Sequence, residues 1–398
     1  MMKKILMLGG GFLQTYVIKR AQELGYYVYV LDGNPYAMGF NFAHEHAVVD
    51  IKDEGACLKY AREKEVDGVL TAATDFPVLS MSRIAEELGL PGINYKSAQM
   101  IKNKAAVRKR LYEAKADDTG YAYEMDSIET AQSVLSKIVF PVMVKPCDGS
   151  GSRGASRVDS AEEFLSACQM AMDGSVTHRA IAEPFIDGRE YGVESFVDNG
   201  DIHILAVMQK DMTRPPFYAE LGHASPSGLP ITLEQKVKDC VRKALIELNV
   251  NHGSVNMDLL ITKSGNVHIV DIGVRMGGNL IGSHIIPIGT GMDYMGNMIR
   301  AAVGDKTCWE PISKPQSVAT KLLALKPGKV VGLPNFREVE TAFKVTIEHH
   351  LHIGDVITPY RTNLDGCGYV VAAGGALEEV VEKAQRAKDY IDNTIERM

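Results

Sequence analysis

The first 95 or so residues alternate short apolar runs with more polar stretches of about ten residues. Residues 3–35 predict a strand, a glycine turn, a helix and a second strand that ends at Asp32. The elements expected after them are a strand over 46–52, a helix near Gly55–Lys64, a strand over Asp67–Thr71 and a helix over about Phe76–Leu88. Such alternation predicts a doubly wound α/β domain built on a parallel sheet.

The turn after the first strand resembles the dinucleotide-binding fingerprint G-x-G-x-x-G, whose third glycine lets helix and strand pack closely. Gly9 and Gly11 occupy the first two positions, but Gln14 occupies the third. Asp32 lies near the distance expected for an acid that binds a ribose. Any parallel strand–helix–strand unit needs a tight turn at this place, so we expect a scaffold here and not an NAD site.

A second glycine-rich loop stands in a different setting. A basic helix over 102–114 opens with Asn103-Lys104, and Lys145 lies in the apolar run of a later strand. A lysine in such a run needs an anionic partner, of which a ligand phosphate is one candidate. The loop Asp148–Gly154 follows, and its consecutive backbone N–H groups suit the oxygens of a polyphosphate; the alternative is a flexible hairpin turn.

Two aspartates are brought together by a predicted hairpin. Residues 251–279 predict two antiparallel strands joined by a turn at Ser264-Gly265, and pairing about that turn places Asp258 opposite Asp271. Two hard oxygen ligands at one spot fit magnesium, which shares its coordination shell with phosphates and water. Solvated hairpin charge is the alternative, although both aspartates have apolar neighbours in the sequence.

The pattern changes again at Pro311. Short predicted strands follow, and a final helix over Glu378–Arg397 carries apolar residues at helical spacing. These elements predict a small α+β domain in this part of the chain.

Composition narrows the class of protein. The chain has 398 residues, 45% hydrophobic and 23% charged, as in a globular enzyme of two or three domains. A net charge of −7 argues against a nucleic-acid partner, because neutralising phosphates needs a surplus of lysine and arginine. Six scattered cysteines without a CxxC pair predict neither a zinc site nor a disulfide framework, which fits the cytoplasm. The apolar start is too short for a signal peptide, and no membrane partner is expected.

In their order along the chain, these features resemble the ATP-grasp superfamily. They are a Rossmann-like region, a lysine before a lid, a lysine on a strand ahead of a glycine loop, an E-x-x-x-x-G-x-E segment and paired acids. The resemblance implies an α/β chain with an ATP-grasp fold, two α+β subdomains gripping ATP, between a Rossmann-like amino-terminal domain and a small α+β carboxyl-terminal domain. The implied domains are 1–97, 98–310 with a lid subdomain at about 115–183, and 311–398.

The resemblance also implies roles for the residues that match the motifs. The residues that would contact ATP are Lys104, Lys145, Gly149, Ser150, Gly151, Ser152, Gly154, Glu183, Phe185, Ile186 and Glu190. Of these, the lysines and the glycine loop would face the phosphates, Glu183 to Ile186 the adenine, and Glu190 the ribose hydroxyls. Asp258 and Asp271 would bind Mg²⁺, with Mn²⁺ as the alternative metal.

Segments 217–230 and 271–294 look closer still to bacterial L-amino acid ligases, a branch of the carboxylate–amine ligases. In that branch Glu220 and His223 would lie beside the reacting carboxyl. Arg275 would meet the transferred phosphoryl group or the substrate carboxylate, because its planar fork suits either. The further substrate candidates are Asp75, which follows a strand of the first domain and has a helix cap as its alternative role, Gly277, Gly278 and Asn279.

The implied reaction moves the γ-phosphoryl group of ATP onto a carboxylate, after which an amine displaces phosphate to form an amide. The partners would be a small carboxylate and an amine, and a homodimer is the commonest arrangement among soluble oligomers. Two positions depart from the family pattern, with Asp271 for glutamate and Gly273 for asparagine. They question a two-magnesium site, for which Glu220 or Asn279 could supply an oxygen. The alternatives are a purine-pathway ATP-grasp enzyme activating bicarbonate or formate, and a catalytically silent nucleotide-binding protein.

Overall fold

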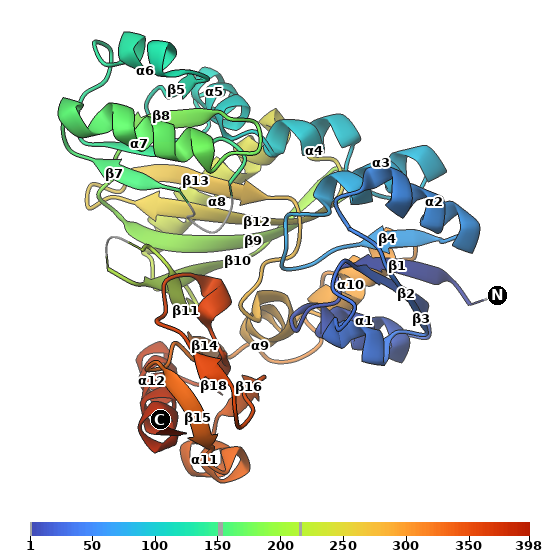
Figure 1. Cartoon of the computed structure of the whole chain (residues 1–398). Helices are drawn as coiled ribbons and strands as arrows, with labels where there is room; N and C mark the ends of the chain where they lie inside the picture. The colour runs from blue at the N-terminus through green and yellow to red at the C-terminus, as the bar shows by residue number, and fades with distance from the viewer. Residues whose placement is uncertain (1, 150–153, 215–216) are drawn as a thin grey trace.

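The computed structural model describes residues 2–149, 154–214 and 217–398. Its amino-terminal part is a parallel sheet in the order β3-β2-β1-β4 (Figure 1). The elements are β1 (Lys4–Leu8), α1 (Gln14–Glu23), β2 (Tyr27–Asp32), β3 (Glu45–Val48), α2 (Glu54–Lys64), β4 (Gly68–Leu70) and α3 (Val78–Leu88). Alternate strand residues pack against α1 on one face and against α2 and α3 on the other, so the doubly wound arrangement is confirmed. The strand predicted over 46–52 is shorter than expected, and the helix predicted from Phe76 begins two residues later.

The glycine turn after β1 is closed by the chain's own side chains. The N–H of Gly10 donates to Asp32 Oδ2 at 2.7 Å, and the buried Gln14 donates from Nε2 to the carbonyl oxygen of Ala72 at 2.6 Å. The Gln14 side chain lies 3.7 Å from the place of a Cβ on Gly9, so it fills the space above the turn. Asp32 therefore closes the turn, which explains its position without a bound ribose.

An eight-stranded antiparallel sheet forms the centre of the molecule in the order β13-β12-β9-β10-β11-β14-β18-β16. Its strands are β9 (Arg189–Asp198), β10 (Asp201–Met212), β11 (Glu220–Ser225), β12 (Gly253–Ile261), β13 (Val267–Gly273), β14 (Ser317–Leu322), β16 (Thr346–His349) and β18 (Gly368–Gly374). Because β14 pairs with β11, strands from the predicted carboxyl-terminal domain extend the central sheet. This continuity brings residues beyond 311 close to those around 220.

A smaller antiparallel sheet, β5-β8-β6-β7, lies over β13 and β12 at the top of Figure 1. Its elements are β5 (Tyr123–Met125), α6 (Ile128–Val134), β6 (Val142–Pro146), β7 (Ser156–Val158), α7 (Ala161–Asp173) and β8 (Ala180–Pro184). We call this unit the lid sheet. It is joined to the first domain through α4 (Tyr95–Ile101) and α5 (Lys104–Ala114), while α8 (Ile231–Glu247) packs against the central sheet.

Further helices and strands belong to the centre of the molecule and to the carboxyl-terminal region. They are the single-turn segment η2 (Ile281–Ile285), α9 (Ile286–Thr290), α10 (Tyr294–Ala302), β15 (Gly328–Gly332), α11 (Phe336–Phe343), β17 (Val356–Ile357), α12 (Leu377–Thr394) and β19 (Glu396–Arg397). The helix predicted to run to Arg397 ends at Thr394, which is a correction. The reason is that β19 pairs with β15 and the Arg397 guanidinium turns back to bind the Asp392 carboxylate at 2.6 Å.

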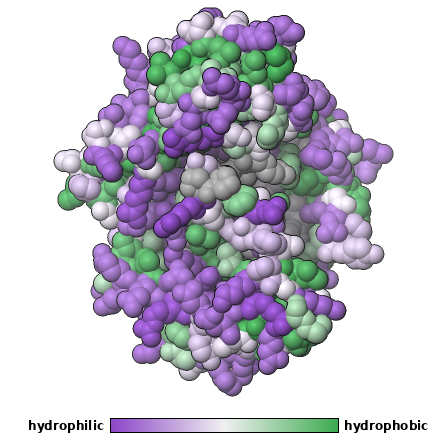
Figure 2. Space-filling view, turned by 60° about the vertical axis from the view of Figure 1, so that its left-hand side comes forward, coloured by the Kyte–Doolittle hydropathy of each residue, from purple (hydrophilic) through white to green (hydrophobic). Residues whose placement is uncertain are grey.

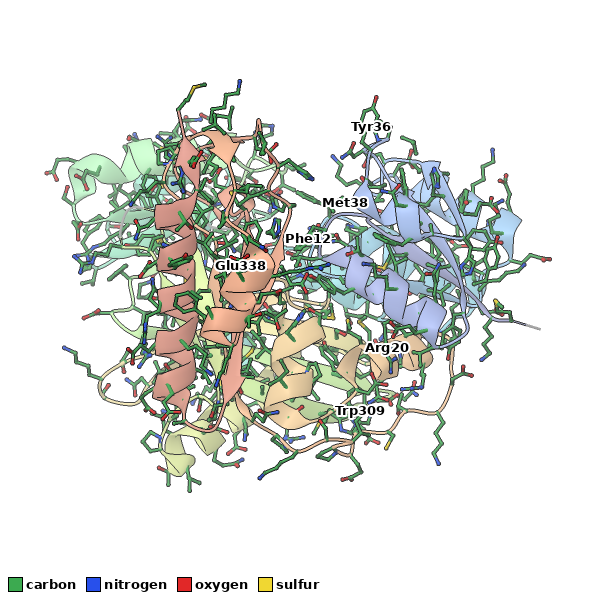
Figure 3. The ribbon with its side chains drawn as sticks, turned by 90° about the horizontal axis from the view of Figure 1, so that it is seen from below. Phe12, Arg20, Tyr36, Met38, Trp309 and Glu338 are labelled. Atoms are coloured by element: carbon green, nitrogen blue, oxygen red, sulfur yellow. The ribbon has the colours of Figure 1, made fainter. Side chains whose placement is uncertain are left out.

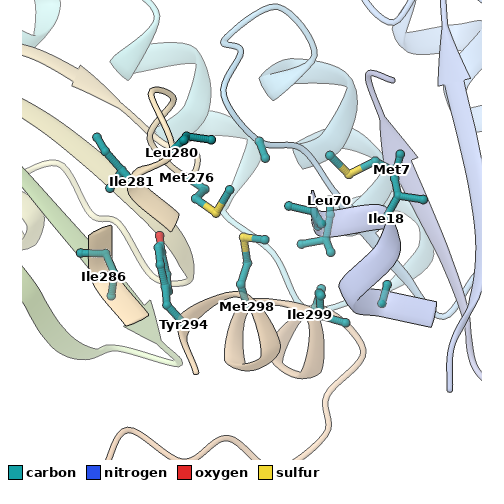
Figure 4. Close-up of a cluster of buried hydrophobic side chains, with 14 of the residues drawn as sticks. Met7, Ile18, Leu70, Met276, Leu280, Ile281, Ile286, Tyr294, Met298 and Ile299 are labelled. Carbon is teal, nitrogen blue, oxygen red and sulfur yellow. The ribbon is translucent and has the colours of Figure 1, made fainter. Parts of the chain in front are cut away.

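A buried apolar cluster joins the first domain to the centre of the molecule. Figure 4 shows Met7 and Leu70 of the parallel sheet beside Met276, with Tyr294 and Met298 of α10 below them. On another side, Phe12 points toward the carboxyl-terminal region (Figure 3), where its ring stacks on Tyr369 with a centroid distance of 6.5 Å. The first domain therefore packs against both the centre of the molecule and the carboxyl-terminal region. None of the helices in the described ranges has the length and apolarity needed to cross a membrane.

Candidate active site

A cavity of about 830 Å³ opens between the lid sheet, α5 and the central sheet. In the space-filling view the molecule is hollowed near its middle, with mainly hydrophilic residues around the hollow (Figure 2). The predicted site residues that line the cavity are Lys104, Lys145, Gly149, Glu183, Phe185, Ile186, Glu190, Glu220, Asp258 and Asp271. The structure thus brings to one cavity the residues predicted for adenine, ribose and metal, together with Lys104, Lys145 and Gly149 of those predicted for the phosphates. The described predicted residues outside this lining are Asp75, Gly154, His223, Arg275, Gly277, Gly278 and Asn279.

Buried charges form a chain at the lid end of the cavity. Lys145 Nζ on β6 lies 2.5 Å from Glu183 Oε1 on β8, and both side chains are about nine-tenths buried. Arg108 of α5 approaches the same carboxylate, with 3.6 Å between Arg108 Nε and Glu183 Oε2, and donates from Nη1 to Asp117 Oδ2 at 2.7 Å. Lys145 therefore has the anionic partner that its burial requires, and its ammonium stands where a nucleotide phosphate is predicted.

Asp258 and Asp271 are direct cross-strand neighbours on β12 and β13, which confirms their predicted pairing, but nearer the turn Ile261 pairs with Val267, one residue from the predicted register. A bulge follows at once, because Leu259 pairs with Ile269 and Val270 is the extra residue. This bulge lets both aspartates face the cavity while Leu259 remains in the core. Lys104, the first residue of α5, forms an ion pair with Asp271.

Lys210 lies at the centre of an acidic cluster. Its Nζ is 2.8 Å from Glu190 Oε1, 2.6 Å from Glu220 Oε1 and 2.8 Å from Asp258 Oδ1, and its side chain is 1% exposed. The three carboxylates come from β9, β11 and β12, so a single ammonium holds three strands in register at the cavity floor. Burial raises the pKa of Asp258 to about 7 despite the lysine, since two further carboxylates stand close by.

Glu220 is also held by the carboxyl-terminal region. Asn363 donates from Nδ2 to Glu220 Oε2 at 2.8 Å and accepts from the Glu220 N–H at 3.0 Å. Tyr360 donates to the Glu220 carbonyl oxygen. Burial raises the pKa of Glu220, but the positive charge of Lys210 outweighs it and brings the pKa to about 2. Glu220 is therefore a fixed carboxylate at the end of the cavity away from the lid.

His223 shares a face of β11 with Glu220 because of a second bulge. Lys210 pairs with His223 while Met212 pairs with Glu220, so Leu221 is the extra residue. Without the bulge, a three-residue spacing would point the two side chains to opposite faces. Burial lowers the pKa of His223 to about 4, and its buried Nδ1 has no hydrogen-bond partner among the described residues. The imidazole is thus neutral at physiological pH.

The pKa of His223 predicts how stability depends on pH. Below 6.5, the ordinary pKa of histidine, the unfolded chain binds a proton that the folded chain excludes down to about 4. As the pH is lowered from 6.5 to about 4, the free energy of unfolding should therefore decrease, by up to about 1.4 kcal/mol per pH unit. Urea unfolding at several pH values should show a shallower decline in His223→Gln than in the wild type. Equal slopes would contradict the buried, neutral imidazole.

Arg275 follows β13 and pairs with the first domain. Its Nη2 donates a hydrogen bond to Asp75 Oδ2 at 3.1 Å, and its Nε lies 3.1 Å from Asp75 Oδ1 as part of the same ion pair. A Cβ on Gly273 would lie 2.8 Å from Asp75 Oδ1 and 3.0 Å from Arg275 Cζ. The glycine found in place of the family's asparagine therefore makes room for this ion pair. Asp75, predicted as a substrate residue, holds Arg275 in the structure.

The segment after Arg275 is fixed by a glutamate that lines no part of the large cavity. Glu194 of β9 is fully buried and accepts from the Gly277 N–H at 3.0 Å, from Tyr294 at 2.5 Å and from Asn256 at 3.0 Å. Gly278 packs beside Leu13 of the first domain. Gly277 was predicted to contact a substrate. In the structure its N–H donates to Glu194 and does not face the cavity.

Asn279 connects this segment to the acidic cluster. Its Nδ2 donates to Glu220 Oε2, and its Oδ1 accepts from Tyr369 at 3.1 Å. Glu220 and Asn279 were the expected extra oxygen sources for a second metal. Their polar atoms are already engaged with each other, with Lys210 and with Tyr369, so this arrangement offers that second site no free oxygen from them.

Three predicted residues, Ser150, Gly151 and Ser152, lie outside the described residues. Gly154 is described and has a φ of +73°, a conformation that suits glycine. The site residues that sequence reasoning missed are Arg108, Glu194, Lys210, Tyr360 and Asn363. Lys210 carried a usable signal, because it ends an apolar run as Lys145 does. Asn363 carried none, since it lies on a short turn far along the chain.

The acidic pair fits a magnesium ion in chemistry. Asp258 and Asp271 provide hard oxygen ligands from adjacent strands, and each is now balanced by a lysine ammonium. In the described part of the chain no group of three or more His, Cys, Asp or Glu residues is arranged to hold a metal by itself. Asp258 and Asp271 would therefore hold the ion together with oxygens from a bound ligand.

Comparison with known families gives the class of protein. Residues 2–90 match the ribonucleotide synthetase preATP-grasp domain, 138–283 match the ATP-grasp domain, and 321–396 match the L-amino acid ligase C-terminal domain 2. The chain belongs to the ATP-grasp superfamily and has the fold expected from its sequence. Within that superfamily it is an ATP-dependent carbon–nitrogen ligase of the carboxylate–amine type.

Individual relatives divide between two branches. An L-amino acid ligase from Bacillus licheniformis is 21% identical, with a TM-score of 0.83 over 97% of each chain. A phosphoribosylglycinamide synthetase from Anaerococcus prevotii is 20% identical, with a TM-score of 0.79 over 100% of this chain and 99% of that one. A formate-dependent phosphoribosylglycinamide formyltransferase from Sulfurisphaera tokodaii is 24% identical over 98% of this chain and 96% of its own length. At these identities the structures show the fold alone.

Proposed function

We propose that the chain activates a small carboxylate with ATP, joins it to an amine and releases ADP and phosphate. One observation carries the proposal: a single cavity runs from Lys145 at the lid, past the paired aspartates, to Glu220. A nucleotide at the lid end would place its terminal phosphate beside the aspartates. An acceptor at the Glu220 end would meet that phosphate there, which is the arrangement that phosphoryl transfer needs.

The first step would form an acyl phosphate. A carboxylate oxygen of the acceptor attacks the γ-phosphorus of ATP, the bond to the β,γ-bridging oxygen breaks, and ADP leaves. Lys104 and Lys145 would hold phosphate oxygens in exchange for their present carboxylate partners. Arg275 has a buried Nη1 without a hydrogen-bond partner among the described residues, and it would stabilise the charge that develops.

The second step would form the amide. The amine nitrogen attacks the acyl carbon, the bond to the phosphate oxygen breaks, and the nitrogen loses a proton. His223 is neutral and so able to accept that proton. When bound at Asp258 and Asp271, magnesium would supply a positive charge beside the transferred phosphoryl group.

The acceptor end of the cavity favours a substrate that carries an amine. Glu220 stays ionised with a pKa of about 2, and Asp258 and Glu190 stand beside it. Even with Lys210 present, these three carboxylates leave an excess of negative charge. This charge balance supports amino acids, whose ammonium group it would attract, as the substrate class of the L-amino acid ligase branch.

The purine-pathway alternative has the full-length formyltransferase relative in its favour. It would require a place for a ribose phosphate, which the first domain would help to form. Among the described residues, those that line the large cavity begin at Lys104, and none belongs to the first domain. Beside the glycine turn, Phe12 packs between His350 and Tyr369. These observations support the amino-acid ligase branch.

The test is phosphate release from Mg·ATP by the purified full chain across a matrix of amino acids paired with amine acceptors. Bicarbonate and formate, each with glycinamide ribonucleotide or aminoimidazole ribonucleotide, form a second set. We expect release above background with at least one amino-acid pair and formation of an amide detected by mass spectrometry. Release only in the second set would move the chain to the purine branch. Nucleotide binding without release in either set would leave the silent nucleotide-binding alternative.

A further inference from the structure

Lys210 uses all of its hydrogen-bonding capacity inside the acidic cluster. An ammonium has three N–H donors, and Lys210 has one carboxylate oxygen from each of three residues between 2.6 and 2.8 Å from Nζ. Its side chain is 1% exposed. Lys210 therefore has no donor left for a nucleotide phosphate, unlike Lys104 and Lys145, each of which pairs with a single carboxylate.

We propose that Lys210 acts as an internal cation that keeps the acidic cluster closed to a divalent metal arriving alone, so that metal enters only with the nucleotide. The inference rests on the proposed function in one respect, the use of a metal–nucleotide complex. It makes Lys210 a positioning residue, which acts through Asp258, Glu190 and Glu220 and need not touch the reacting atoms.

The charges explain why a lysine is needed. Asp258, Glu220 and Glu190 are brought together in the cavity lining, where their side chains are between 16% and 26% exposed, and Asp271 lies directly across from Asp258. Without a cation, three partly buried carboxylates would repel one another and would attract a divalent ion. With Lys210 present, one oxygen of each carboxylate is occupied and the cluster loses one unit of excess negative charge.

The same geometry leaves room for a metal that brings its own ligands. Among the residues that the structure describes, Asp258 binds Lys210 through Oδ1 and has no partner at its second oxygen, and Asp271 forms its ion pair with Lys104. Magnesium dehydrates reluctantly and is usually bound by one or two carboxylates together with phosphates. A nucleotide would supply phosphate oxygens and would also engage Lys104, which frees Asp271. Metal and nucleotide should therefore bind with strong positive coupling.

The test is a titration of the full chain with Mn²⁺ alone, in which free Mn²⁺ is followed by electron paramagnetic resonance. In the wild type we expect no site tighter than about 1 mM without nucleotide, because two carboxylates that share lysines hold a metal weakly. Lys210→Met should gain a site at least about tenfold tighter, since a unit charge at close range is removed. Lys321→Met is the matched control: Lys321 is a buried lysine whose Nζ lies 2.5 Å from Asp211, outside the cavity lining.

Either of two results would overturn the inference. One is tight Mn²⁺ binding by the wild type without nucleotide; the other is a folded Lys210→Met that binds Mn²⁺ no better than the wild type. If Lys210→Met does not fold, the wild-type titration still decides, together with Lys210→Arg, which keeps the charge and should exclude Mn²⁺. Thermal unfolding adds a second readout, because Mn²⁺ should raise the melting temperature only when ADP is present. A wild type that does not bind ADP would count against the proposed function, whereas the titrations with metal alone would remain interpretable.

Discussion

Lys145→Met is expected to weaken nucleotide binding at least about 100-fold, because it removes a buried cation from the predicted phosphate site. Lys145 Nζ lies 2.5 Å from Glu183 Oε1, and the lysine side chain is 10% exposed. Among the described residues, its loss would leave the Glu183 carboxylate with Arg108 as its cationic neighbour, whose Nε is 3.6 Å away. Affinity would be measured by isothermal titration with Mg·ADP, and the free energy of unfolding by urea denaturation.

The double variant Lys145→Met/Glu183→Gln separates binding from stability. Breaking a buried ion pair destabilises a protein by about 3–5 kcal/mol, because one charge is left without its partner. Neutralising Glu183 as well should restore most of that stability but should not restore the affinity for nucleotide. If the double variant bound Mg·ADP as the wild type does, Lys145 would be a structural residue only.

Much of the fold could be predicted because its signals are local. The alternation of apolar runs with helical stretches predicted the parallel sheet, and the hairpin pattern predicted that Asp258 pairs with Asp271. That pairing depends on the bulge at Val270 as well as on the turn, and the bulge was not predicted. The predicted ends of helices and strands were less accurate where tertiary contacts determine where the element stops. The last helix stops at Thr394 because the residues after it pair with a strand more than sixty residues earlier, which no local pattern shows.

Site residues could be predicted where a charged side chain stands in an otherwise apolar run of the sequence. Lys145 could be singled out because a lysine in an apolar strand needs a partner, and Lys210 at the end of ILAVMQK carries the same contradiction. Asn363 could not be found in this way, since an asparagine in a polar turn is ordinary. It reaches Glu220 only because β14 and β18 continue the central sheet, so that a turn 143 residues away lies beside the cavity.

The departure at Gly273 could be recognised from the sequence, but its physical meaning required the structure. An asparagine at this position is part of the family pattern, and its absence raised the alternative of a silent protein. In the structure the space for a side chain at Gly273 is taken by Asp75 and Arg275. The glycine is therefore accounted for by an ion pair between the first domain and the candidate active site, and it gives no independent support to loss of activity.

Gly273→Asn, which restores the family's residue, is accordingly expected to lower the rate of phosphate release about 100-fold, the effect of displacing a reacting group by roughly 1 Å. A Cβ at this position would lie 2.8 Å from Asp75 Oδ1 and 3.0 Å from Arg275 Cζ, so the ion pair must move. Nucleotide affinity should change little, because the Lys145 end of the cavity is untouched. Phosphate release with an active substrate pair and titration with Mg·ADP would measure the two effects.

Gly375→Asn is the matched control for this prediction, since a Cβ there meets no atom within 4 Å. It should keep the wild-type rate. The cause can be tested in the background of Asp75→Ala, which itself should slow the reaction by releasing Arg275. If the clash with Asp75 is responsible, adding Gly273→Asn to that background should cost much less than it does in the wild type. A Gly273→Asn variant as active as the wild type would show that the Asp75–Arg275 pair can move without loss, and Arg275 would then not need the position in which Asp75 holds it.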